Sequence, residues 1–157
     1  MSDSLATTET PTGFDEARAE EFVGKVLGNY GATLAALSTA IGDKLGLFKD
    51  LAANGPASSV ELATRTGINE RYAREWLAHM HAVGYLDYDI PEGRYILPPE
   101  HVPALADEHG PVFFGGVHQM LLGVSDVLGP LVDAFRGGGG VPQAAYVEDW
   151  WEGMARF

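Results

Sequence analysis

One segment near the middle of the chain limits its fold most, because helix-capping residues recur there at short intervals. Ser58 and Glu61 are three positions apart, which is the spacing of a capping box at the start of a helix. Gly67 can end that helix in the left-handed conformation, and Asn69 can cap the next helix, which Gly84 ends. The segment therefore predicts two short consecutive helices.

A third helix and a hairpin flank this pair. The stretch "GDKLGLFKDLA" has apolar residues at roughly helical spacing. After Gly84, the residues Leu86, Tyr88 and Ile90 alternate with polar ones, which is typical of a half-buried strand, and "RYILP" supplies a return strand after a turn. Three helices and a two-stranded hairpin predict a winged-helix domain over residues 44–98, in a mainly α chain. The expected core face of its last helix is Ile68, Tyr72, Trp76, Leu77, Met80 and Val83.

The residues before this domain predict a tail and a helical region. Residues 1–14 form an acidic stretch that we expect to be disordered. Residues 15–43 contain many glycines and alanines, and we interpret them as N-terminal dimerisation helices that pack closely with a second subunit. The alternative is a helix pair that breaks near 29–31 and is buried within one monomer. The uncharged run in this region is too short and too polar for a membrane helix.

Charge and composition restrict the functions. The formal net charge is -12, and the four arginines between residues 54 and 97 are outnumbered by six acidic residues. Because DNA is a polyanion, we expect no nucleic-acid binding. Cysteine is absent, so neither disulfides nor cysteine-ligated metals can form, and a cytoplasmic location is expected.

Three stretches carry a family resemblance: "AIGDKLGLFKDLA", "ELATRTGINERYAREWLAHMHAVGYLDYD" and "GRYILPPEHVPALAD". They resemble the amino-terminal winged-helix region of bacterial class I S-adenosylmethionine (SAM)-dependent methyltransferases, a group similar in layout to the small-molecule O-methyltransferases. The resemblance extends to the closing "DWWEGMARF". It implies that this region makes the enzyme a homodimer and helps to cover the pocket for a small-molecule methyl acceptor. It also implies that SAM and the chemistry belong to a carboxyl-terminal Rossmann-like domain.

The motifs of that catalytic domain are not found in the sequence. A nucleotide-binding domain begins with a strand that leads into a glycine-rich loop. The only glycine run, 137–140, follows the helical pattern "PLVDAFR", and we interpret it as a linker. We therefore expect no catalytic or cofactor-binding residue in this chain, which on its own should be inactive. The histidine spacing predicts no metal site, and carboxylate pairs such as Glu148 and Asp149 are interpreted as solvated.

The remaining residues, 99–157, predict a helical lid or linker that leads towards a missing methyltransferase domain. A short helix should follow Pro98 and Pro99. A helix or a helix pair should span 112–135, with a break expected at Gly129 and Pro130. If this region roofs a substrate pocket, as the resemblance implies, its aromatic and methionine side chains suit a flat apolar ligand. The substrate-pocket candidates are Phe113, His118, Met120, Trp150 and Trp151.

Two hypotheses about function follow. In the first, the chain is the dimerisation and substrate-lid region of a SAM-dependent small-molecule methyltransferase. In the second, it is a free-standing winged-helix transcription regulator or an effector-binding module. The scarcity of basic residues favours the first hypothesis.

Overall fold

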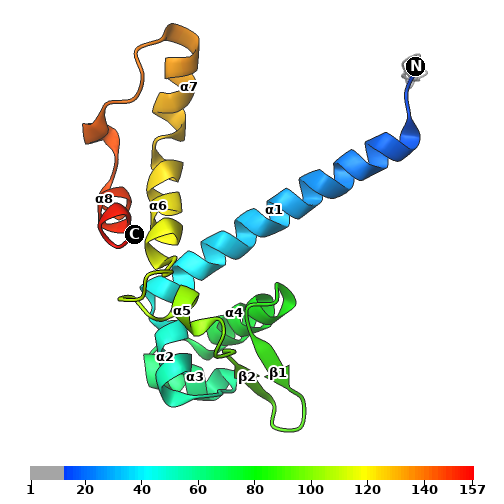
Figure 1. Cartoon of the computed structure of the whole chain (residues 1–157), viewed down its shortest axis with the longest axis vertical. Coiled ribbons are helices and arrows are strands. Elements are labelled where there is room, and N and C mark those ends of the chain that lie inside the picture. Colours follow the sequence, from blue (N-terminus) through cyan, green and yellow to red (C-terminus); the bar gives the residue numbers. More distant parts are fainter. Residues whose placement is uncertain (1–12) are drawn as a thin grey trace, which may run out of the picture. The chain divides into compact units, whose positions relative to one another are not determined.

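The computed structural model describes residues 13–157, so most of the predicted tail lies outside the described residues. The chain divides into two compact units, Met1–Thr33 and Leu34–Phe157. A single helix, α1 (Glu16–Lys44), contains the boundary between them (Figure 1). It continues through residues 29–31. The alternative of a helix pair predicted a break at these residues.

The described part of the first unit is the N-terminal half of α1. Its apolar side chains are between 48% and 65% exposed: Phe22, Val23, Val26, Leu27 and Tyr30. A Cβ atom added at Gly24, Gly28 or Gly31 would meet nothing within 4 Å. Among the residues that the structure describes, this segment therefore presents an open face of apolar side chains and glycines.

The second unit contains the predicted winged helix. Its helices are α2 (Leu47–Asn54), α3 (Ser59–Thr66) and α4 (Glu70–Ala82), and its wing is the antiparallel pair β1 (Asp87–Asp89) and β2 (Arg94–Ile96). Tyr88 is paired with Tyr95, and a bridge between Ala57 and Tyr95 ties the segment before α3 to the wing. The mainly α fold with a winged helix and flanking helices is confirmed.

The caps that set the helix boundaries also match the prediction. Ser58 and Glu61 form a complete capping box at the start of α3. Gly67 ends α3 in the left-handed conformation, and the Asn69 side chain accepts a hydrogen bond from the backbone N–H of Arg71. These caps are local, so neighbouring residues determine them.

The core of the second unit lies between the helices of the winged helix and the wing. It consists of Leu47, Phe48, Leu51, Ala57, Leu62, Trp76, Leu77, Met80, Leu86, Leu97 and Leu105. The Trp76 indole N–H donates to the Ser38 carbonyl at 2.9 Å, which joins the last turns of α1 to α4. A Cβ atom at Gly42 would lie 2.4 Å from the Trp76 ring, so this position needs glycine for close approach.

Three apolar side chains that the sequence placed on the inner face of the last helix or of the strand are exposed. Tyr88 of β1 is 39% exposed. Tyr72 is 72% exposed, because the buried stripe of α4 runs through Ala73, Trp76, Leu77 and Met80, one position further on. Ile90 is 81% exposed, because β1 ends one residue earlier and the chain turns into solvent at the wing tip.

The C-terminal part is helical. It contains α5 (Val102–Leu105), α6 (Gly115–Asp126), α7 (Leu128–Gly137), a 3-10 turn η1 (Gln143–Ala145) and α8 (Glu148–Ala155). The break between α6 and α7 falls at Val127 rather than at Gly129–Pro130. Pro130 lies in the first turn of α7, where the backbone N–H has no helical partner to lose.

Helices α6 and α8 lie side by side and approach each other at glycines (Figure 1). A Cβ atom at Gly116 would lie 2.5 Å from the Gly153 carbonyl oxygen, and one at Gly123 would lie 2.7 Å from the Trp150 backbone. The glycine run 137–140 begins with the last residue of α7, and residues 138–140 lie in the loop between α7 and η1. Among the described helices, none combines the length and apolar character needed to cross a membrane.

Candidate functional site

A pocket of about 380 Å³ opens where the end of α4, helix α5 and the start of α6 meet. Its size falls within the range of about 300–1,000 Å³ typical of small-molecule sites. The lining residues are Val83, Gly84, Tyr85, Glu100, His101, Ala104, Leu105, Phe114 and His118. Most of this wall is apolar, and two imidazoles supply its main polar groups.

Local hydrogen bonds hold the three elements around the pocket. Gly84 adopts a φ of 79° and reverses the chain after α4. The His101 Nδ1 lies 2.9 Å from the Tyr85 carbonyl oxygen, which joins α5 to this turn. The Phe114 backbone N–H donates to the Ala104 carbonyl at 2.9 Å, which joins α6 to α5. The pocket is therefore assembled from short segments that the backbone fixes.

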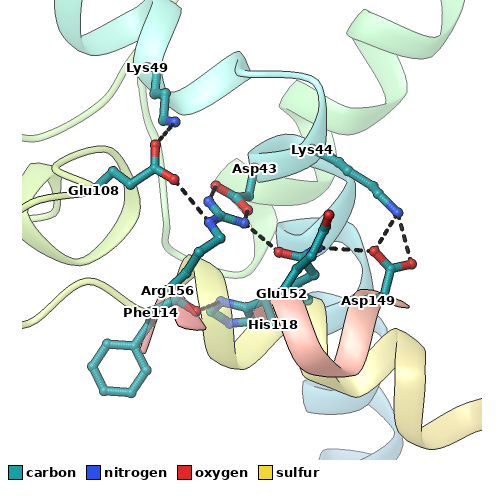
Figure 2. Close-up of polar contacts among 10 residues, drawn as sticks. Asp43, Lys44, Lys49, Glu108, Phe114, His118, Asp149, Glu152 and Arg156 are labelled. Carbon is teal, nitrogen blue, oxygen red and sulfur yellow. Dashed lines mark hydrogen bonds and ion pairs between the residues drawn. The ribbon is translucent and has the colours of Figure 1, made fainter. Parts of the chain in front are cut away.

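The state of His118 follows from its surroundings. Its Nδ1 lies 2.8 Å from the Phe114 carbonyl oxygen (Figure 2). Because a carbonyl can only accept, Nδ1 carries the proton and donates it. Burial lowers the pKa of His118, while the Phe114 carbonyl and the charge of Asp43 act in the opposite direction. At neutral pH the ring is neutral, and its Nε2 is a hydrogen-bond acceptor.

A cluster of charged and polar residues lies beside the pocket, centred on Arg156, the residue that follows α8 (Figure 2). The Arg156 guanidinium donates to both Asp43 carboxylate oxygens, at 2.8 and 3.0 Å, and to Glu108 at 2.9 Å. It also donates to the Gln119 side-chain oxygen at 2.7 Å and lies 5.4 Å from the centre of the Phe113 ring. Its hydrogen bond with Asp43 is the main reason that the pKa of Arg156 is raised. These contacts fasten α8 to α1 and α6.

Two lysines extend the cluster. Lys44 donates to both Asp149 oxygens at 2.8 Å, and Lys49 pairs with Glu108. These lysines are the leading cause of the lowered pKa of Asp149 and of Glu108. Asp149 is therefore ion-paired, and its interpretation as a solvated carboxylate is wrong. Because every acidic group named here has a cationic partner, we interpret the cluster as structural.

The structure brings one of the predicted pocket candidates, His118, into the pocket. Phe113 is 5% exposed and lies under Arg156. Met120 packs against Gly153, and Trp150 packs against Gly123, so both contribute to the contact between α6 and α8. Trp151 is 42% exposed, and its indole N–H donates to the Tyr146 carbonyl at 3.2 Å.

Sequence reasoning missed His101 and Phe114, which complete the pocket with His118. Neither residue stands in a motif, and their proximity depends on how α5 and α6 fold back on the end of α4. Only the helix predicted after Pro98 and Pro99 could have drawn attention to His101. Within residues 13–157, no group of three or more histidine, aspartate or glutamate side chains is arranged to hold a metal ion.

The sequence of the second unit matches a known domain family over residues 32–107, described as the Rv2258c-like winged HTH (helix-turn-helix) domain. Residues 32–107 are therefore similar to the Rv2258c-like winged helix-turn-helix domain. The match covers the end of α1, the whole winged helix and α5. Among curated proteins, none matches the sequence.

Solved structures extend the likeness beyond the Rv2258c-like domain. The chain superposes on N,N-8-amino-8-demethyl-D-riboflavin dimethyltransferase from Streptomyces davawensis with a TM-score of 0.64 and 23% identity, over 85% of this chain and 42% of that one. The superposition on human N-acetylserotonin methyltransferase in complex with SAM has a TM-score of 0.63 and 19% identity, and it covers 94% of this chain and 43% of that one. The superposition on PigF with SAH has a TM-score of 0.60 and 24% identity, and it covers 78% of this chain and 34% of that one.

These likenesses concern the fold, and the chain spans less than half the length of each protein. Together with the family match, they support the predicted resemblance: the Rv2258c-like domain and its flanking helices have the fold of the amino-terminal region of SAM-dependent methyltransferases.

Proposed function

We propose that this chain is the dimerisation and substrate-lid region of a cytoplasmic SAM-dependent small-molecule methyltransferase, and that it is not catalytic on its own. The observation that carries the proposal is the fold match, which includes 94% of this chain but only 43% of a methyltransferase in complex with SAM. In this proposal SAM binds outside these residues, and the lid is formed by the C-terminal helices.

The exposed face of α1 supports dimerisation. Val23, Val26, Leu27 and Tyr30 recur at helical spacing, so they form one apolar stripe. Gly24, Gly28 and Gly31 run beside it with open space around them, which would let a second helix approach closely. An apolar stripe of this length on a single chain is typical of an interface.

The position of the glycine run supports the absence of catalysis by this chain alone. A phosphate- or SAM-binding glycine loop follows a strand and precedes a helix. The run 137–140 instead begins at the last residue of α7 and precedes η1. The shifted carboxyl groups Glu108 and Asp149 are held in ion pairs, which leaves no general base with a raised pKa among them.

The alternative of a DNA-binding regulator has little electrostatic support. In the wing, Arg94 pairs with Glu61, and in α3 Arg65 pairs with Asp50. A DNA-reading wing needs its cations for phosphates. Arg65 and Arg94 are instead used within the fold, and Arg74 lies 3.9 Å from Glu70 of the same helix.

The central experiment isolates the native protein from its source cells with an antibody raised to this chain. We expect a polypeptide heavier than this chain that is labelled by ultraviolet cross-linking to tritiated SAM, while the purified chain is not labelled. A native polypeptide of the same mass as this chain, with no labelling, would contradict the proposal. A salt-sensitive gel shift with DNA would then favour the regulator.

The dimer is tested by analytical ultracentrifugation of the purified chain. We expect a dimer, and we expect Leu27→Asp to give a monomer because the charge lies in the apolar stripe. The matched control is Lys25→Glu, which reverses a charge on the opposite side of the helix and should leave the dimer intact. A monomeric starting protein would sink this part of the proposal.

A further inference from the structure

The turn between α2 and α3 contains the one place in the sequence where glycine follows asparagine, at Asn54 and Gly55. Asn54 is the last residue of α2 and is exposed, and Gly55 has a φ of 74°. An asparagine loses its side-chain amide most readily before glycine, because no side chain then shields the backbone nitrogen that attacks the carboxamide. Asn29 and Asn69 do not have this neighbour.

Hydrogen bonds engage both groups that would react. The Gly55 backbone N–H donates to the Leu51 carbonyl at 3.0 Å, and the Asn54 side-chain N–H donates to Asp50 Oδ1 at 2.8 Å. The nitrogen of Gly55 can attack only after the last turn of α2 opens, which also frees the carboxamide. The rate of the reaction therefore follows the population of the open turn.

Arg65 of α3 holds this turn closed. Its Nε lies 2.9 Å from Asp50 Oδ2, and its two terminal nitrogens donate to the carbonyls of Asn54 and Gly55 at 3.3 Å. The Asp50 side chain is only 11% exposed, so salt screens this pair weakly. One guanidinium thus fixes both the carboxylate that binds the Asn54 amide and the backbone around the reacting bond.

We propose that Asn54 is a site of spontaneous deamidation, and that the pair of Arg65 with Asp50 sets its rate. The Gly55 nitrogen loses its proton and bonds to Cγ of Asn54, the bond from Cγ to Nδ2 breaks, and ammonia leaves with that proton. Water then opens the five-membered ring at either carbonyl carbon, which gives aspartate or isoaspartate. The reaction needs only these residues and water, so it does not depend on the proposed function.

Either product disturbs the same turn. The aspartate product places a second carboxylate beside Asp50, where the Asn54 amide had donated a hydrogen bond. The isoaspartate product adds one carbon to the main chain shortly before Ala57. The Ala57 backbone N–H donates to the Tyr95 carbonyl at 3.0 Å, and its carbonyl accepts from the Tyr95 N–H at 2.8 Å. Deamidation should therefore loosen the attachment of this turn to the wing.

The test is incubation of the purified chain in warm, mildly alkaline buffer, followed by peptide mapping with mass spectrometry. We expect the conversion of amide to carboxyl at Asn54, with Asn29 and Asn69 unchanged as internal controls. An equal amount of ammonia should be released, and one oxygen atom should enter from isotopically labelled water. Electron-transfer fragmentation distinguishes isoaspartate from aspartate.

Variants separate the control by Arg65 from general unfolding. Arg65→Leu should speed deamidation about tenfold, as the loss of a charged hydrogen-bonding partner predicts. Arg65→Lys keeps a cation beside Asp50 but lacks the fork, so it should speed the reaction less and keeps the test valid if Arg65→Leu does not fold. The matched control is Arg74→Leu, at an arginine that is 58% exposed, which should leave the rate unchanged.

The consequence for the wing is measured by hydrogen exchange. The amides of Ala57 and Tyr95 should exchange faster in the deamidated chain and in Asn54→Asp, whereas Asn54→Gln, which keeps an amide, should protect them as the starting chain does. Unchanged exchange in the deamidated chain would reject this consequence. An intact Asn54 in both the starting chain and Arg65→Leu would overturn the site, and equal rates in the folded chain and both Arg65 variants would overturn the control by the ion pair.

Discussion

The winged helix and the C-terminal helices are stabilised in different ways. The winged helix has a core of large apolar side chains and helix ends fixed by neighbouring residues. Helices α6 and α8 instead meet at glycines, and Arg156 joins them to α1 through the Asp43 carboxylate, which is far away in the sequence. The comparison teaches that one part depends on apolar burial, whereas the other depends on close backbone contact and charge.

The largest effect is expected for a truncation in the winged-helix core. Leu77 is fully buried, so Leu77→Ala should lower the free energy of unfolding by about 2–5 kcal/mol through the lost contacts and the cavity. Urea unfolding followed by circular dichroism measures this change. Val60→Ala is the control, because Val60 is 61% exposed and its loss should be nearly neutral. An equal loss of unfolding free energy in Leu77→Ala and Val60→Ala would show that apolar burial does not stabilise the winged helix.

A smaller loss of stability is expected for a substitution at the contact between α6 and α8. A Cβ atom at Gly153 would lie 2.6 Å from the Gly116 carbonyl oxygen, so Gly153→Ala should destabilise the helix pair by about 1–3 kcal/mol. Hydrogen exchange of α8 amides reports it locally. Gly129→Ala, where the added Cβ meets nothing within 4 Å, should be neutral or slightly stabilising. Unchanged protection of α8 in Gly153→Ala would contradict the close packing.

The charge cluster is tested next. Arg156→Met should destabilise α8 by about 1–2 kcal/mol, because it leaves the Asp43 carboxylate, which is 4% exposed, without its cation. Hydrogen exchange should rise in α8 but not in α4. Arg136→Met is the control, since Arg136 and Asp133 are 74% and 77% exposed and such pairs contribute little. A loss of protection that extended equally through α4 would show that the two regions are not independent.

The smallest effect is a change with pH in the winged helix. Hydrogen bonds from Arg94 and Ser58 lower the pKa of Glu61 from 4.5 to about 2. Because the folded state holds this carboxyl ionised, its contribution is complete above about pH 4.5 and is lost as the pH falls towards 2. NMR titration of the Glu61 carboxyl checks the value, and Glu61→Gln should remove the dependence. A midpoint near 4.5 would contradict the hydrogen bonds.

The same comparison explains what the sequence could predict. The boundaries of α3 and α4 follow from Ser58, Gly67 and Asn69, whose effects extend over three or four residues. The placement of Tyr72 was wrong because periodicity predicts a stripe but does not fix which neighbouring column faces the core. The break at Val127 was placed two residues late, because a proline is tolerated in a first helical turn.

The candidate site was less predictable. The sequence predicted His118 as one of several substrate-pocket candidates, and no sequence pattern indicated that His101 lines the same pocket. Arg156 and Asp43 are 113 positions apart, and neither residue lies in a recognisable motif. Contacts of this kind depend on the tertiary arrangement of helices, which caps and periodicity do not specify.

The side chain of Glu61 both caps α3 and binds the wing. It accepts hydrogen bonds from the Ser58 backbone N–H at 2.8 Å and from the Arg94 guanidinium of β2 at 2.6 and 3.1 Å. A partner that bent the wing away from α3 would therefore also have to uncap that helix. The wing and α3 consequently form one mechanical unit, and a load applied to the hairpin is carried directly into the helix and the core beneath it.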